Sequence, residues 1–179
     1  MDPVQLRPFA AAQLPLVRPW FEHAEVRRRL GGPDWPARSL RLDERDPAGE
    51  EFRGCRVLRA HTWLAWHGES PVGYLGGEVY DRWARWDGSD PGRPVVSHAE
   101  AGPAMGSAYV VDPARWRQGY GVAMLRAWLA APQVADVRVF VLGIDDDNVA
   151  SRRCAVRAGF VADPPEPDWE DIVHHLFRR

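Results

Sequence analysis

The segment Arg117-Gln118-Gly119-Tyr120-Gly121 constrains the fold of this chain more than any other. A strand-like run, Met105 to Val111, precedes it, and helical spacing of apolar residues follows from about Gly119 to Ala130. A second strand-like run at Val137 to Leu142 and a second helical stretch from about Val149 to Ala158 come next. This β-loop-α-β-α order predicts an α/β sheet that contains at least one parallel crossover.

A glycine loop between a strand and a helix is suited to binding an anion. The unpaired N–H groups and the positive end of the helix dipole point outward together there, and glycine lets the backbone approach a ligand closely. The loop is not a dinucleotide fingerprint, because the third glycine of that pattern would fall at Met124, and it is not a P-loop, because the chain has no lysine. A phosphate site and a purely structural turn are both consistent with this spacing.

The first half of the chain reads as a strand followed by helices. Residues from Val4 to Phe9 alternate apolar and polar side chains as a half-buried strand does, and Ala11 to Phe21 shows helical spacing. Glycine and proline predict a loop at Gly31 to Pro36. We also expect a short helix at Glu50 to Leu58.

A hairpin and a long loop are expected in the middle of the chain. Two apolar runs, His61 to Trp66 and Val72 to Tyr80, flank His67 to Pro71, which has the length and glycine content of a hairpin turn. Prolines, glycines and tryptophans from Asp81 to Pro103 then predict a long functional loop. The end of the chain is expected to add one or two strands, with Ile172 to Phe177 the best candidate.

Composition favours one domain and excludes several functions. With 179 residues, of which 45% are hydrophobic, the chain is long enough for one substantial core, and we expect residues 1–179 to form a single domain. All 23 basic residues are arginine, so chemistry that needs a lysine nucleophile or base is excluded. The net charge of −2 argues against nucleic-acid partners and against binding to a membrane surface.

Cysteine use and hydropathy bear on metal binding and location. Cys55 and Cys154 lie far apart and match neither a disulfide framework nor a zinc spacing, so we expect free thiols and no metal site. No stretch has the pattern of a signal peptide or a membrane span, so we expect a cytoplasmic protein.

Several short motifs occur in an order that resembles the acetyl-CoA-binding core of GNAT N-acetyltransferases, over roughly Met105 to Phe160. That family has a strand ending in Val-x-Pro, an R/Q-x-x-G-x-G/A loop that opens a helix, another strand, an N-x-x-S/A motif and a final Gly-Phe. The matching motifs are Val111-Asp112-Pro113, Gly119-Tyr120-Gly121, Asn148 to Ser151 and Gly159-Phe160. The resemblance implies the single-domain α/β GNAT fold, a mixed central sheet flanked by helices with a splayed central strand pair, in an acetyl-CoA-dependent N-acetyltransferase.

The same resemblance implies where acetyl-CoA binds. The glycine loop is expected to hold the pyrophosphate, the preceding strand to pair with the pantetheine amides, and Asn148 and Ser151 to face the cleft. Asn148 also has the position of a helix N-cap, and the two roles can coexist. The implied cofactor-binding residues are Tyr109, Val110, Val111, Arg117, Gln118, Gly119, Tyr120, Gly121, Val122, Ala123, Asn148 and Ser151.

Two positions depart from the family pattern. Trp116 stands where the loop motif has arginine or glutamine, although an aromatic residue there is similar to some ribosomal-protein N-acetyltransferases. Ala155 stands where many members carry a tyrosine proposed to protonate the leaving thiolate. The acid is therefore absent or supplied from elsewhere.

The general base is not evident from the motifs. The strand before the loop offers Ser107, which is not a good base unaided. Glu78 and Asp81 at the end of the hairpin, or His98 and Glu100 before the strand, are alternatives that act directly or through water. Ser107 and Glu78 are the leading catalytic candidates.

The acceptor is inferred from the first half of the chain. Its Trp-Phe-Glu-His and Gly-Gly-Pro-Asp-Trp segments resemble aminoglycoside 6'-N-acetyltransferases, in which carboxylates and indoles would bind a polycation. Three functions follow: acetylation of a small cationic amine such as an aminoglycoside or polyamine, acetylation of a protein amino terminus as in the ribosomal-protein type, or non-catalytic acyl-CoA binding. The family also makes a homodimer possible. The implied substrate-binding residues are Trp35, Glu78, Asp81 and Trp86.

Overall fold

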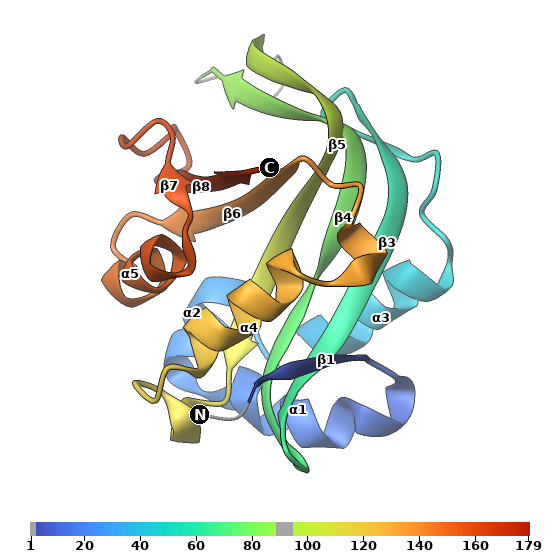
Figure 1. The fold of residues 1–179 in the computed structure, drawn as a ribbon, viewed down its shortest axis with the longest axis vertical. Helices are drawn as coiled ribbons and strands as arrows, with labels where there is room; N and C mark the ends of the chain where they lie inside the picture. Colours follow the sequence, from blue (N-terminus) through green and yellow to red (C-terminus); the bar gives the residue numbers. More distant parts are fainter. Residues whose placement is uncertain (1–2, 89–94) are drawn as a thin grey trace. The chain divides into compact units, whose positions relative to one another are not determined.

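The computed structural model describes residues 3–88 and 95–179, which form a mixed sheet of eight strands flanked by helices (Figure 1). The hydrogen-bonded strand order is β1-β3-β4-β5-β6-β8-β7, and β2 pairs with β3 outside this path. The elements are β1 (Gln5–Pro8), η1 (Ala11–Gln13), α1 (Leu14–Glu22), α2 (Ala24–Leu30), α3 (Trp35–Glu44), β2 (Glu51–Phe52), β3 (Cys55–His67), β4 (Ser70–Asp87), β5 (Val95–Val111), η2 (Pro113–Arg115), α4 (Tyr120–Leu129), η3 (Pro132–Val134), β6 (Val139–Asp145), α5 (Val149–Ala158), β7 (Val161–Ala162) and β8 (Ile172–Arg178).

The chain forms two compact units. Unit 1 comprises Met1–Asp46, His61–Gly77 and Ala108–Val134, and unit 2 comprises Pro47–Ala60, Glu78–Ser107 and Ala135–Arg179. The long strands β3, β4 and β5 contribute residues to both units. Each unit is described by itself below.

In unit 1 the first three helices bury their apolar sides against one face of the strands. Leu64 of β3, Tyr74 of β4 and Val110 of β5 belong to the same core cluster as the helical residues Val17, Trp20, Phe21, Val26 and Leu40. The rings of Phe9 and Phe21 meet the Tyr74 ring edge-on, with centroids 5.3 and 5.6 Å apart. The helical spacing of residues 11–21 thus produces a packed amphipathic helix, as the sequence predicts.

Helix α4 packs at Gly73 of β4. A Cβ atom added at Gly73 would lie 2.7 Å from Met124 Sδ and 2.9 Å from the Val110 carbonyl oxygen, closer than real Cβ atoms approach such atoms. Gly73 therefore lets the helix and the neighbouring strand come close to β4. Side chains of α4 at Met124, Leu125 and Trp128 are fully buried.

The sheet of unit 2 carries buried apolar side chains on both faces, and its helix packs on one of them. Helix α5 packs on β6, β7 and β8, on the face that carries the rings of Phe140, Phe160 and Phe177. The opposite face carries a smaller cluster, onto which Trp83 of β4 packs. Within the described part of unit 2, α5 is the one helix, so no helix of this unit covers that second face.

The strands β5 and β6 are parallel over a short stretch, as the βαβ order predicts. Their ladder runs from the pair Ala104 and Val139 to the pair Gly106 and Val141. Strand β5 continues to Val111 without further pairing to β6, while β6 pairs with β8. This short parallel ladder agrees with the expected splayed central pair.

The predicted helix at residues 50–58 is wrong. The chain there forms β2, a tight turn and the start of β3, with Glu51 paired to Arg56 and Phe52 to Cys55. Arg53 and Gly54 occupy the turn with φ of 49° and 72°. Two consecutive left-handed residues are the geometry of a type I′ hairpin turn, which the apolar spacing did not reveal.

The predicted long loop at residues 81–103 is also wrong where the structure describes it. Strand β4 continues to Asp87 and β5 begins at Val95, so residues 81–87 and 95–103 of this segment lie in strands. Residues 89–94 lie outside the described residues. The glycines and prolines were counted over the whole segment, yet most of them fall between residues 88 and 94, and the flanking stretches keep strand propensity.

The N-terminal loop prediction is partly wrong as well. Helix α2, which the sequence reading missed, ends at Leu30 before the left-handed Gly31. Helix α3 begins inside the predicted loop, at Trp35, with proline in its first turn, where proline is well tolerated.

No helix in the described ranges is long and apolar enough to cross a membrane.

Replacing Gly73 by alanine should destabilise the protein, because the Val110 backbone that meets the new methyl cannot move aside freely. We expect a loss of about 1–3 kcal/mol in the free energy of unfolding. Gly106→Ala is the matched control, since a Cβ there meets nothing within 4 Å and adds strand propensity. Thermal melts of both variants test this, and equal melting temperatures would contradict the close packing at Gly73.

Candidate functional site

The glycine loop leaves β5 through a short capped turn. The Asp112 side chain accepts a hydrogen bond from Ala114 N–H at 3.0 Å and begins η2. The backbone then takes left-handed conformations at Arg117, with φ of 62°, and at Gly119, with φ of 87°. A non-glycine residue in this region is uncommon, and the pair turns the chain sharply into α4.

The N-terminus of α4 has no side-chain cap. Its N-cap residue is Gly119, no side chain bonds to the first turn, and that turn contains no acidic residue. The first backbone bond runs from Ala123 N–H to the Gly119 carbonyl at 3.1 Å. The preceding N–H groups therefore point along the helix axis at its positive end, which is the arrangement that binds phosphate and other anions.

Trp116 fixes the loop where the family motif has arginine or glutamine. Its indole N–H donates to the Val111 carbonyl at 2.9 Å, and its ring meets the His23 ring edge-on at 4.7 Å. His23 is itself fixed, because its Nδ1 accepts from Glu25 N–H at 3.3 Å as the N-cap of α2. The sequence marked Trp116 only as a departure and did not predict its contact with His23.

Tyr120 anchors the first turn of α4 from the other side. The residue is 8% exposed, and its hydroxyl lies 3.4 Å from Nδ1 of His67 at the end of β3. The Arg115 guanidinium lies over the Tyr120 ring, 5.9 Å from its centroid. Tyr120 therefore supports the loop from beneath, with its side chain buried at the start of the helix.

Arg117 is the exposed cation of the loop. It makes no ion pair or hydrogen bond with any residue in the described ranges, whereas Arg115 is paired with Asp112 at 3.5 Å. Tyr109, Val110 and Val111 precede the loop in the same unit, so unit 1 brings together the predicted cofactor residues of 109–111 and 117–123.

Asn148 and Ser151 lie in unit 2, at the N-terminus of α5. The Asn148 Oδ1 atom accepts a hydrogen bond from Ser151 N–H at 3.2 Å, so Asn148 is a helix N-cap, as its position predicts. This bond uses the side-chain oxygen and leaves the Nδ2 amide as a donor toward a ligand.

Most of the candidate bases are held in ion pairs or hydrogen bonds of unit 2. Hydrogen bonds from Arg82 and from Arg56 N–H hold the pKa of Asp81 below its usual range. Arg178 lowers the pKa of Glu100 in the same way, with Nε 2.9 Å from the carboxylate, and His98 adds a contact at 3.2 Å. A carboxylate with a lowered pKa is a weak proton acceptor.

The leading catalytic candidates have different surroundings. Glu78 accepts a hydrogen bond from the Tyr80 hydroxyl at 3.3 Å, and burial together with this carboxylate raises the pKa of Tyr80. The Ser107 hydroxyl is buried and has no hydrogen-bond partner among the described residues. Both lie in unit 2.

The two predicted tryptophans of the acceptor site lie in different units. Trp35 packs against the core of unit 1, with the Arg38 guanidinium over its ring at 5.9 Å. Trp86 packs in unit 2 beside the turn at Gly54, where an added Cβ would be 3.6 Å from the indole. Trp35 therefore belongs to unit 1, whereas Glu78, Asp81 and Trp86 belong to unit 2.

Neither Cys55 nor Cys154 forms a disulfide among the described residues. Within residues 3–88 and 95–179, no three histidine, cysteine, aspartate or glutamate side chains gather in a way that could hold a metal ion.

Comparison with known proteins gives consistent matches. A family model described as acetyltransferase (GNAT) domain matches residues 4–161. An uncharacterized N-acetyltransferase of Bacillus subtilis (strain 168), YfmK, is 25% identical over 166 residues, which are 93% of this chain and 90% of the relative. The chain is also similar in fold to AAC(6')-Ib in complex with paromomycin and acetyl-CoA, with a TM-score of 0.70, 17% identity and coverage of 99% of this chain and 94% of that chain.

A second solved structure has the same fold and a different acceptor. RimL, a ribosomal L7/L12 alpha-N-protein acetyltransferase in complex with coenzyme A, matches with a TM-score of 0.61 and 16% identity. The match covers 99% of this chain and 95% of that chain.

Two substitutions at Asn148 separate its capping role from any other role. Asn148→Ala should lower the free energy of unfolding by about 1 kcal/mol, because the Ser151 N–H loses its acceptor. Asn148→Asp should keep stability, because a carboxylate caps equally well and suits the helix dipole. Chemical denaturation of both variants checks this, and equal losses would show that the cap is not what Asn148 contributes.

Proposed function

Because the chain belongs to the GNAT family of acetyltransferases, whose model covers residues 4–161, we propose that it transfers the acetyl group of acetyl-CoA to a primary amine of a small cationic molecule, of the aminoglycoside or polyamine type. The observation that carries the cofactor assignment is the uncapped N-terminus of α4. Two of the structural relatives are complexes with acetyl-CoA or coenzyme A.

The pyrophosphate of acetyl-CoA fits the donors of the glycine loop. Of the backbone N–H groups that the family pattern implies, that of Ala123 is bonded to the Gly119 carbonyl. The donors left for the diphosphate are those of Gln118, Gly119, Gly121 and Val122. The helix dipole stabilises the two negative charges of the diphosphate at its positive end. The guanidinium of the exposed Arg117 adds a positive charge there.

The pantetheine arm would pair with the backbone of Tyr109 to Val111, in the manner of an added strand. The Trp116 indole already donates to the Val111 carbonyl, but a carbonyl oxygen has two lone pairs and can accept a second bond. The Asn148 Nδ2 amide would donate to the same arm. These assignments come from the family pattern.

The protein has to do three things for the reaction to proceed. It must take a proton from the ammonium form of the acceptor, stabilise the oxyanion that forms at the thioester carbonyl, and let the thiolate leave. A backbone N–H near Val110 would serve the oxyanion. The tyrosine acid of many relatives is replaced by Ala155, which is fully buried, so the proton for the thiolate comes from elsewhere.

A cationic acceptor is supported by the residues of unit 2 rather than by any bound molecule. Glu78 and Asp81 on β4 add negative charge, and Trp86 of the same strand offers an indole face. The fold of AAC(6')-Ib, which binds the aminoglycoside paromomycin, agrees with this class of acceptor.

Acetylation of a protein amino terminus is the second candidate. The buried Ala155 and the aromatic Trp116 favour it, and the similar fold of RimL agrees with it. Non-catalytic acyl-CoA binding is the third possibility and is distinguished by the absence of turnover.

A direct assay separates the three functions. We expect the purified protein to release free thiol from acetyl-CoA in the presence of aminoglycosides or polyamines. Release only with short peptides that have free amino termini would instead support the second function. Silence across the whole panel, with acetyl-CoA still raising the melting temperature, would support a binding module.

A matched pair of variants tests the phosphate site. Gly121→Asp places a carboxylate where the pyrophosphate is proposed to bind, and Gly121→Asn places an uncharged side chain of the same size there. We expect Asp to weaken acetyl-CoA binding at least about tenfold more than Asn, measured by calorimetry, through like-charge repulsion. Both should fold, because Asp at a helix N-terminus is favourable. Equal affinities would contradict a phosphate site at this loop.

A further inference from the structure

His174 of β8 and Asp168 of the preceding loop form a hydrogen-bonded pair that the sequence did not reveal. The His174 Nε2 atom lies 2.9 Å from Asp168 Oδ2, and the two side chains are 20% and 14% exposed. No spacing motif marks residues six apart in this way. The pair forms because the loop before β8 folds back, with Asp168 N–H donating to the Ile172 carbonyl at 2.8 Å.

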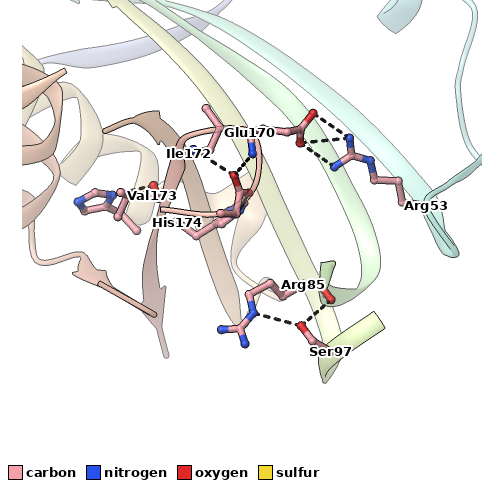
Figure 2. A network of polar contacts seen from close by, with 9 residues as sticks. Arg53, Arg85, Ser97, Glu170, Ile172, Val173 and His174 are labelled. Carbon is pink, nitrogen blue, oxygen red and sulfur yellow. Dashed lines mark hydrogen bonds and ion pairs between the residues drawn. The ribbon is translucent and has the colours of Figure 1, made fainter. Parts of the chain in front are cut away.

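The carboxylate of this pair is rigidly held. Asp168 Oδ1 accepts hydrogen bonds from the backbone N–H groups of Glu170 at 2.8 Å and Ile172 at 3.1 Å, which Figure 2 shows beside His174. Burial would raise the pKa of Asp168, but the bonds from His174, Ile172 and Glu170 outweigh it, so the pKa lies below its usual range. The group is thus an ionised acceptor at neutral pH.

An ionised acceptor at Nε2 fixes the tautomer of the imidazole. Nε2 carries the proton and donates it to Asp168, so Nδ1 presents a lone pair. The Nδ1 atom is buried and has no hydrogen-bond partner among the described residues. A histidine that is oriented through one nitrogen and has no partner at the other has the arrangement of a general base. In such a base, a carboxylate orients the ring and stabilises its protonated form.

Nearby charges do not replace Asp168 as the partner of His174. Glu170 on the same loop is paired with Arg53 at 3.4 Å, and Arg85 of β4 donates to Ser97 at 3.2 Å (Figure 2). The neighbouring His175 points to the other face of β8, where burial lowers its pKa and its Nδ1 lies 3.1 Å from the Val173 carbonyl.

The pair lies on the sheet face of unit 2 that carries the buried cluster of Ala104, Val139, Val141 and Leu176. His174 is directly opposite Gly143 of β6, and Val141, two residues earlier on the same face, is opposite Gly106, the last residue of β5 that pairs with β6. Gly106 leaves open space above the strand. Trp83, which packs on this face, has its ring 5.4 Å from the His174 ring.

We propose that His174, oriented by Asp168, is the proton acceptor for the amine substrate, and that the space above Gly106 beside Trp83 receives that amine. The inference rests on the proposed acetyltransferase function, which requires that the ammonium form of the acceptor lose a proton. An indole at this face suits a cationic amine, because its ring attracts the ammonium group.

Two proton transfers accompany the transfer of the acetyl group. His174 Nδ1 takes one proton from the ammonium group, directly or through one water, and becomes an imidazolium stabilised by Asp168. The neutral amine then attacks the thioester carbon, so the C–N bond forms and the C–S bond breaks. The second amine proton ends on the departing thiolate, giving CoA-SH, and the imidazolium returns its proton to solvent. Net products are the amide, CoA-SH and one proton.

The test compares three variants of the full chain. His174→Gln keeps an amide donor toward Asp168 but has no titratable nitrogen, and kcat/KM for the amine should fall about 100-fold. Asp168→Asn keeps the backbone contacts and should cost at least about tenfold. Glu170→Gln is the matched control, because it changes the charge of the same loop and leaves the pair intact, and it should stay within about twofold.

The pH profile separates a base from a merely structural residue. His174→Gln should lose the acidic limb of the wild-type kcat/KM profile, while its melting temperature and its acetyl-CoA affinity stay close to wild type. An unchanged limb and rate in a folded His174→Gln would overturn the role of His174 alone. Absence of turnover in the wild type would instead overturn the proposed function.

An independent readout holds even without turnover. Nitrogen-15 NMR of the imidazoles should show His174 in the Nε2–H tautomer in the free protein, and Asp168→Asn should reduce that preference. A dominant Nδ1–H tautomer in the wild type would overturn the proposal, because Nδ1 would then have no lone pair for a proton.

Discussion

The start of α4 leaves its first backbone donors without a side-chain cap and is nevertheless held in one conformation by its neighbours in unit 1. A helix normally satisfies these donors with a side-chain cap, but here the N-cap is Gly119. The conformation is held from outside the turn instead. Trp116 bonds to the Val111 carbonyl and meets His23, and Tyr120 is buried against His67. Preorganised donors of this kind bind an anion without a cost of reorganisation.

In unit 2 the polar group that is held in one orientation is the imidazole of His174. Helix α5 covers one face of β6 and β8, and the other face carries small residues beside an imidazole with an unpaired nitrogen. The carboxylates that the sequence suggested as bases are engaged with arginines, which lowers the pKa of Asp81 and of Glu100. His174 differs from them, because its partner Asp168 orients it without occupying Nδ1. An oriented imidazole with an unpaired nitrogen can accept a proton, whereas a carboxylate of lowered pKa is a weak acceptor.

Local signals in the sequence predicted the second half of the fold well. The alternation at 105–111, the glycine loop and the periodicity of 149–158 correspond to β5, α4 and α5, and Gly159 ends α5 in a left-handed conformation as a C-cap glycine does. The segment 81–103 was misread because its glycines and prolines were counted over the whole segment, although the parts that form β4 and β5 keep strand propensity. Composition over a long window cannot separate strand from loop within it.

The site was predictable only where its residues are close in sequence. The loop and the Asn148 cap are local motifs, so the sequence located both. The partners of Trp116 and of His174 depend on how the chain folds back on itself, and no local pattern in the sequence predicts either contact. The cofactor, acceptor and catalytic roles assigned to these residues remain predictions that binding and kinetic measurements test.

The most direct test of the central claim is an amide NMR titration of the protein with acetyl-CoA. The account predicts that the largest shifts of backbone N–H resonances fall at Gln118, Gly119, Gly121 and Val122, because these donors would bond to the pyrophosphate. Pantetheine lacking the nucleotide should leave these four resonances unchanged. Saturating acetyl-CoA that leaves the loop resonances in place would contradict the assignment of this helix N-terminus as the cofactor site.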